Sequence, residues 1–220
     1  AISSRSIRSC ASRLKGMDEQ LLLPAERALR RNLIGVILFS RENYEQGIFN
    51  FDLALTTSRL DQGLTAQIYL NLASSYYKLG LMEKAFSTLN ISEFAYLQPN
   101  EVAKYHKLKI KLAKELDNRE AMIKSMIWYL AGKSKISDLK ADTVFEQLLS
   151  EFFKGSRSEK IRTLENFESN ELLVVAYLAY LEVEKLYYKG EKAEAKDLME
   201  WIEERYSKFP EIEMMVTNFS

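Results

Sequence analysis

The chain contains few of the residues that cross-link proteins, ligate metals or interrupt helices. Its single cysteine, Cys10, excludes an internal disulfide and leaves the redox compartment undecided. Its single histidine, His106, argues against a histidine-based metal site within the chain. With only three prolines and eight glycines, we expect few breaks between long elements. We expect neither a metal nor a cofactor.

Net charge and long apolar runs are also lacking. The 31 basic residues balance the 31 acidic ones, so no overall field draws the molecule onto nucleic acid or a membrane surface. No apolar run reaches the roughly 18 residues that a membrane span requires, and no secretory signal is visible. A hydrophobic fraction of 47% nevertheless supports a packed core. We therefore expect a folded chain that neither binds nucleic acid nor spans a membrane.

No catalytic constellation is present either. His106 lies in a lysine-rich stretch without the serine and acid partners of a nucleophilic triad, and we expect it on the surface or in a groove. No glycine-rich phosphate loop precedes a helix. Carboxylate pairs such as Glu203-Glu204 lie in charged helical stretches, where an exposed face is a simpler explanation than acid–base chemistry. We expect a protein that is not an enzyme.

Residues 1–23 form a basic, serine-rich segment. Four cations and five serines, but no acid, occur in its first seventeen residues. A mitochondrial transit peptide has this composition, as do a flexible linker and a short helical cap, so its role stays open. Because the chain begins with Ala1, we expect a processed product or a fragment of a larger protein.

What the chain does contain is a repeat. Five small residues, Gly47, Ala85, Ala121, Ser158 and Ala195, follow one another at intervals of 38, 36, 37 and 37 residues. A step of this size is typical of a stacked repeat protein, in which small residues allow neighbouring helices to approach closely.

The clearest unit, residues 66–99, resembles a tetratricopeptide repeat. The family's order of bulky, small, aromatic and turn residues is matched by Tyr69, Leu72-Ala73, Tyr76, Gly80, Met82, Ala85, Leu89, Ser92 and Pro99. Two extra residues precede the proline, which we expect to lengthen the second helix. A second copy surrounds Gly35, a thinner one surrounds Tyr105, and the copy around Gly190 is clear again. Residues 138–167 hold a degenerate one.

This resemblance implies an all-α fold, a right-handed solenoid of about five antiparallel helix pairs within residues 24–210, followed by a tail over 211–220. No strand pattern and no second domain are visible. We expect helices over residues 24–40, 44–58, 64–79, 82–97, 100–116, 118–131, 138–153, 157–167, 170–189 and 191–207.

The resemblance also implies a concave groove lined by the first helix of each pair. The expected groove residues are Asn32, Val36, Phe39, Leu70, Asn71, Ser74, Tyr77, Lys78, His106, Lys107 and Ile110, with Tyr180, Glu184 and Tyr187 from the last repeat. This mixed strip suits an extended peptide or a helix of a partner protein. Only Asn71 and Lys107 match the clamp with which some family members hold a chaperone's carboxyl terminus, so we expect no such clamp.

One helix carries a basic stripe. Lys104, Lys107, Lys111 and Lys114 are three or four residues apart and therefore share one side of the helix expected over 100–116. The stripe could attract an acidic peptide or a phosphate, or it could be a solvated face.

A narrower resemblance concerns residues 117–121 and 126–130, and the later run that ends with Tyr206-Ser207-Lys208-Phe209-Pro210. These are similar to the helical domain of LppC-like penicillin-binding-protein activators, which are bacterial envelope lipoproteins. The resemblance implies a periplasmic scaffold, with a cytoplasmic location as the alternative. Cys10 does not follow a lipobox, so we do not expect it to be lipidated.

Two hypotheses result. The leading one is a non-enzymatic scaffold that binds a partner protein in its groove. The alternative is a structural spacer or self-association module of a larger protein.

Overall fold

The structure is a computed structural model that describes residue 16 and residues 18–57 and 60–217. Throughout the described part the chain is helical and contains no strand, which confirms the all-α class. The chain divides into two compact units, with the boundary between Asn118 and Arg119. Cys10 and most of the basic segment lie outside the described residues.

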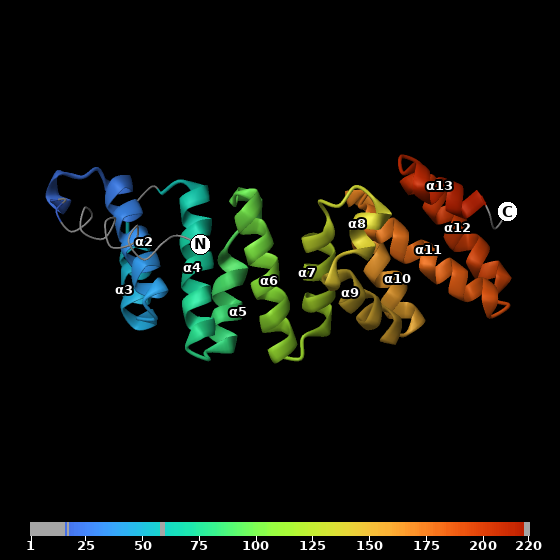
Figure 1. The fold of residues 1–220 in the computed structure, drawn as a ribbon, viewed down its shortest axis with the longest axis horizontal. Coiled ribbons are helices and arrows are strands. Elements are labelled where there is room, and N and C mark those ends of the chain that lie inside the picture. Colours follow the sequence, from blue (N-terminus) through green and yellow to red (C-terminus); the bar gives the residue numbers. More distant parts are fainter. Residues whose placement is uncertain (1–15, 17, 58–59, 218–220) are drawn as a thin grey trace. The chain divides into compact units, whose positions relative to one another are not determined.

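The N-terminal unit consists of successive helices that pack on their neighbours in the chain (Figure 1). After the 3₁₀ turn η1 (Glu19–Leu21), its elements are α2 (Pro24–Ser40), α3 (Tyr44–Leu55), α4 (Gln62–Lys78), α5 (Met82–Ile91), η2 (Phe94–Tyr96) and α6 (Pro99–Glu115). Helix α4 also contacts α2 and α6 directly. The first helices of successive pairs therefore lie beside one another.

Local sequence explains where these helices begin and end. Pro24 and Pro99 begin α2 and α6, where the missing N–H is not needed for a helical hydrogen bond. The carboxylate of Asp61 accepts the backbone N–H of Leu64 at 2.6 Å and caps α4. Gly80 ends α4 with a φ of 75°, a conformation that glycine adopts without strain. The bounds of α2 match the prediction, and those of α4 and α6 lie within two residues of it.

A glycine allows α2 and α3 to pack closely. A Cβ atom added at Gly35 would lie only 2.4 Å from Cε1 of Phe51, a ring that is fully buried between the helices. Gly47 of α3 faces the same contact, because its added Cβ would lie 3.3 Å from the carbonyl oxygen of Gly35. The small residues thus occur where the two backbones approach each other.

The prediction of a longer second helix over 82–97 is wrong. Helix α5 ends at Ile91, and the Ser92 hydroxyl donates to the carbonyl oxygen of Ala66 in α4 at 2.9 Å. Phe94 then places its ring 5.6 Å from that of Tyr105 in α6. The extra residues therefore form a connector held by both flanking first helices.

The C-terminal unit is organised around one buried helix. Its elements are α7 (Arg119–Leu130), α8 (Ile136–Lys140), α9 (Thr143–Lys154), α10 (Arg157–Glu165), η3 (Glu168–Asn170), α11 (Leu173–Tyr188), α12 (Lys192–Tyr206) and α13 (Pro210–Thr217). Helix α11 packs against α7, α8, α10, α12 and α13, and residues 173–180 are all buried. These contacts reach beyond the neighbouring helix pair.

Several expectations for this unit need correction. The helix expected over 138–153 is divided into α8 and α9, because the side chain of Asp142 caps α9 by accepting the N–H of Val144 at 3.0 Å. Ser158, the fourth small residue of the series, is exposed on α10 and packs between no helices. The expected tail contains α13, whose Ile212 and Val216 are buried.

Candidate functional site

A chain of side-chain hydrogen bonds, which we call the amide network, joins the three first helices of the N-terminal unit. The Asn71 amide on α4 donates to Asn32 Oδ1 on α2 at 2.9 Å. The Asn32 amide donates back to Gln67 Oε1 at 3.2 Å. The Gln67 amide in turn donates to Glu101 Oε1 on α6. The network therefore links α2, α4 and α6 across one face.

The amide network follows the period of the repeat. Its bonds join residues 39, 35 and 34 positions apart, so equivalent places on successive first helices meet. Sequence reasoning identified Asn32 and Asn71 but missed Gln67 and Glu101. The signal was present: Gln67 precedes Asn71 by one helical turn, and Glu101 lies in the first turn of α6.

The expected groove residues divide into a buried and a reachable set. The buried set, at most 9% exposed, consists of Asn32, Leu70, His106 and Ile110. These residues cannot line an open groove, because neighbouring side chains cover them. The reachable set is half-buried or exposed and consists of Val36, Phe39, Asn71, Ser74, Tyr77, Lys78 and Lys107. We call this reachable set the inner face.

His106 is a core residue, which corrects its expected place on the surface or in a groove. Its side chain is 1% exposed, and neither ring nitrogen has a hydrogen-bond partner in the described part of the chain. The rings of Phe94 and Tyr105 lie edge-on to it, each with a centroid distance of 5.0 Å. Burial, followed by the charge of Lys109, lowers the pKa of His106 to about 4. The imidazole is therefore neutral at neutral pH.

The basic stripe is solvent-accessible. All four of its members, Lys104, Lys107, Lys111 and Lys114, are exposed on α6. An anionic partner can reach them, and so can solvent.

A second stripe was not foreseen and lies on α2. Leu29, Leu33 and Val36 are 45%, 42% and 39% exposed and follow one another at spacings of four and three residues. This spacing places the three side chains on one side of the helix. We call it the α2 apolar stripe. Val36 belongs both to this stripe and to the inner face.

Of the three wall residues expected from the last repeat, only Tyr187 is exposed. Tyr180 is buried, and its hydroxyl donates to Glu184 Oε1 at 2.8 Å. Burial, followed by this carboxylate, raises the pKa of Tyr180 above its usual range. Tyr180 and Glu184 therefore form a hydrogen-bonded pair with each other.

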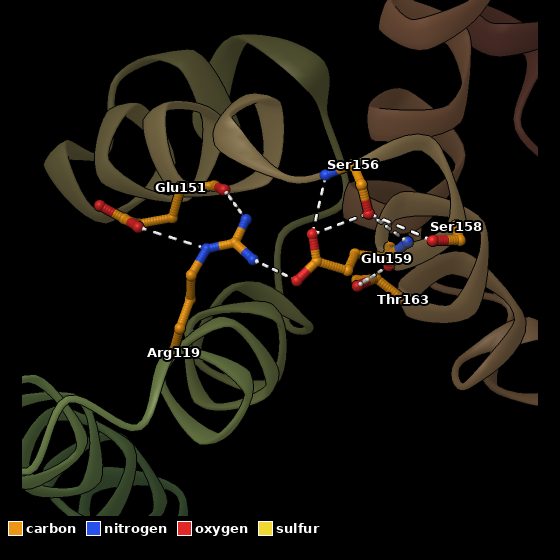
Figure 2. A network of polar contacts seen from close by, with 6 residues as sticks. All are labelled: Arg119, Glu151, Ser156, Ser158, Glu159 and Thr163. Carbon is orange, nitrogen blue, oxygen red and sulfur yellow. Dashed lines mark hydrogen bonds and ion pairs between the residues drawn. The ribbon is translucent and has the colours of Figure 1, made fainter.

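The C-terminal unit has its own polar network, centred on Arg119 at the start of α7 (Figure 2). The Arg119 guanidinium lies 3.2 Å from Glu159 Oε1 on α10 and 3.7 Å from Glu151 Oε2 on α9. Ser156 donates its backbone N–H to Glu159 Oε2 at 2.8 Å. Hydrogen bonds from Ser156, more than the charge of Arg119, lower the pKa of the Glu159 carboxyl. The network caps α10 and ties three helices together.

Two searches of the described residues bear on function. No group of three or more histidine, cysteine, aspartate or glutamate side chains there could hold a metal ion. None of the described helices is both long and apolar enough to cross a membrane.

Comparison with known proteins adds no relative, since no family model, curated protein or solved structure matches the chain.

Proposed function

We propose that the N-terminal unit is a protein-interaction module that binds a peptide or helix of a partner along its inner face. The observation that carries this proposal is the amide network. It fixes α2, α4 and α6 relative to one another through side chains that are already paired. A surface held in this way loses little conformational freedom when a partner binds.

The inner face offers complementary chemistry for a peptide. Phe39 and Tyr77 are half-buried aromatic residues, which supply contact area at a low cost in side-chain entropy. The Asn71 amide donates to Asn32 but is only partly buried, so its remaining polar capacity can serve a peptide backbone. Lys78 and Lys107 favour an acidic partner.

We extend the proposal to the tetratricopeptide-like solenoid that the sequence pattern implies. The successive packing of α2 to α6 and the 34–39-residue spacing of the amide network support it in the N-terminal unit. A place in a bacterial envelope, in the manner of LppC-like activators, is supported by the sequence resemblance alone. On this proposal, the protein is a non-enzymatic scaffold.

A random-peptide phage library selected on the full chain tests this proposal. Enriched peptides should bind Tyr77→Ala about 10-fold more weakly, because the substitution removes an aromatic contact from the inner face. Glu83→Ala, an exposed change on α5, is the matched control and should bind normally. Peptides that bind Tyr77→Ala as well as the original chain would contradict the proposal.

Self-association is a second candidate, because the α2 apolar stripe is exposed. Light scattering of the full chain and of Leu29→Lys/Leu33→Lys tests it. A dimer that dissociates in the double variant would support self-association through α2, since the lysines of both copies would be buried together and repel one another. A monomer in both proteins would exclude it.

A further inference from the structure

The C-terminal unit contains a cavity of about 250 Å³ between α10, α11 and α12. Its apolar lining consists of Ile161 and Leu164 from α10, Leu186 from α11, and Leu198 and Trp201 from α12. Cavities that bind small ligands are mostly apolar, with a few polar groups that set orientation. The lining of this cavity supplies the apolar surface that such a ligand site requires.

The polar part begins with a buried ion pair. Lys160 of α10 and Glu182 of α11 both line the cavity, and their side chains are 9% and 8% exposed. Lys160 binds Glu182 Oε1, but Glu182 Oε2 is buried and has no hydrogen-bond partner in the described part of the chain. A buried carboxylate oxygen without a donor is costly, so a ligand that supplies a donor would be stabilised here.

The remaining charges of the lining favour a cation. The lining contains four carboxylates and two cations. Lys160 pairs with Glu182, and Arg157 pairs with Glu194 at 3.1 Å. Within the described residues, Glu165 and Asp197 have no ion-pair partner and are exposed at the rim. A negative rim above an apolar cavity attracts cations.

The lining of the cavity suits an organic cation better than a metal ion. The acidic side chains of the described residues form no cluster that could hold a metal. The apolar lining, with the Trp201 ring among it, instead matches a hydrocarbon framework that carries one charged end.

We propose that this cavity binds an organic cation, a primary ammonium or guanidinium group on an apolar or aromatic body. The apolar body contacts Leu164, Leu198 and Trp201, while the charged end lies among the carboxylates and gives Glu182 its missing donor. Such a group is carried by a free amine or by a lysine or arginine side chain of another protein. The site lies in the C-terminal unit and is independent of the inner face.

Fluorescence of Trp201 in the full chain provides the test, with Trp128→Phe as background because the sequence has two tryptophans. The probes are phenethylamine, the neutral 2-phenylethanol and the anionic 3-phenylpropanoate. We expect a saturable change with phenethylamine at millimolar Kd or below, as suits a ligand of about nine non-hydrogen atoms. The alcohol should bind at least about 10-fold more weakly and the acid not at all, because they lack the charge that the rim favours.

Rim variants locate the binding. Glu165→Gln/Asp197→Asn removes two exposed charges and should weaken phenethylamine about 10-fold, whereas the matched pair Glu200→Gln/Glu203→Gln, outside the cavity, should not. Lys160→Met/Glu182→Met replaces the buried pair without leaving a lone charge. In it, the preference for the amine over the alcohol should shrink, because the Glu182 acceptor is gone, but should not vanish, because Glu165 and Asp197 remain.

A capped Leu-Lys-Leu peptide distinguishes the two sources of the cation. Binding tighter than that of phenethylamine, with the same loss in the rim variant, identifies a protein side chain; weaker binding identifies a free amine. Equal binding of amine and alcohol to the original chain, or equal amine binding by the rim and control variants, would overturn the proposal. Neither result depends on the phage selection on the inner face.

Discussion

The two units contain buried polar side chains that are accommodated in three different ways. In the N-terminal unit, Asn32 is buried with its amide oxygen and nitrogen both bonded. His106 is buried, neither of its ring nitrogens is bonded within the described residues, and it remains uncharged at neutral pH, since its pKa is about 4. In the C-terminal unit, Lys160 and Glu182 are buried as a pair. For each case we expect a different change in the free energy of unfolding on substitution or on a change of pH.

The buried imidazole of His106 should make the N-terminal unit sensitive to acid. Its folded pKa of about 4 lies below the unfolded value of 6.5, so the unfolded chain takes up the proton first. The stability that neutral His106 contributes is therefore complete above about pH 6.5 and is lost as the pH falls towards 4. Between about pH 7.5 and 4.5, the free energy of unfolding should fall by roughly 2 kcal/mol more in the original chain than in His106→Met. Urea unfolding at both pH values measures this, and equal losses would refute it.

Breaking the Lys160–Glu182 pair should cost far more than replacing it. Lys160→Met leaves Glu182 buried without its cation and should lower the free energy of unfolding by about 3 kcal/mol or more. Lys160→Met/Glu182→Met should recover most of that loss, because no uncompensated charge remains. Urea denaturation compares the two, with Lys196→Met as control, since its exposed contact with Glu200 is 3.8 Å long. A double variant as unstable as the single one would be inconsistent with this reasoning.

At the scale of elements, close approach between helices depends on small residues at particular places. Gly35 allows α2 to meet Phe51 of α3, and the fully buried Ala73 and Ala85 lie on the packed faces of α4 and α5. The C-terminal unit keeps Ala195 buried but exposes Ser158. Regular spacing of small residues in the sequence is therefore a packing signal only where a partner helix covers them.

Gly35→Ala should destabilise the protein even though alanine favours helix. The added Cβ would meet three atoms of the Phe51 ring at 2.4, 2.7 and 2.8 Å, so either this buried ring or the two helices must shift. Overpacking of this kind costs about 1–3 kcal/mol and opposes a helix-propensity gain of about 1 kcal/mol. Thermal unfolding should show a lower Tm for Gly35→Ala and partial recovery in Gly35→Ala/Phe51→Leu. Gly132→Ala, where an added Cβ meets nothing within 4 Å, is the control. An equal change of Tm in Gly132→Ala and Gly35→Ala would show that the clash with Phe51 does not cause the destabilisation.

At the scale of the whole molecule, the described chain is two compact units, each with its own buried helices. The core of the N-terminal unit includes Phe51, Ile68 and Leu112, and that of the C-terminal unit is built on α11. Substitutions far apart and without shared partners act independently. A destabilising substitution in one unit should therefore leave the local stability of the other unit unchanged.

Hydrogen exchange followed by mass spectrometry tests this separation. Gly35→Ala should speed amide exchange in α2 to α6 while leaving α11 and α12 unchanged, because its clash lies within the N-terminal unit. Lys160→Met should instead speed amide exchange in α11 and α12 and leave α2 to α6 unchanged. Faster exchange throughout the chain in both variants would mean that the units unfold together.

Much of the element layout was predictable because its causes are local. Gly80 and Pro99 interrupt helices through their own backbone constraints, and the apolar periodicity around Leu72 and Tyr76 needs no distant partner. The end of α5 was missed because Ser92 bonds to Ala66, 26 residues away. The candidate site was predicted in part: Asn71 and Tyr77 remain reachable, whereas His106 is covered by Phe94 from the connector.

Sequence by itself determined that this chain is helical and where most of its helices begin, since helix periodicity, caps and breakers act within a few residues along the chain. Only the tertiary structure decided that α11 is a central helix, that His106 is buried, and that one oxygen of Glu182, beside a cavity, has no donor among the described residues. Burial and pairing depend on which distant side chains come together, and neither composition nor spacing specifies that.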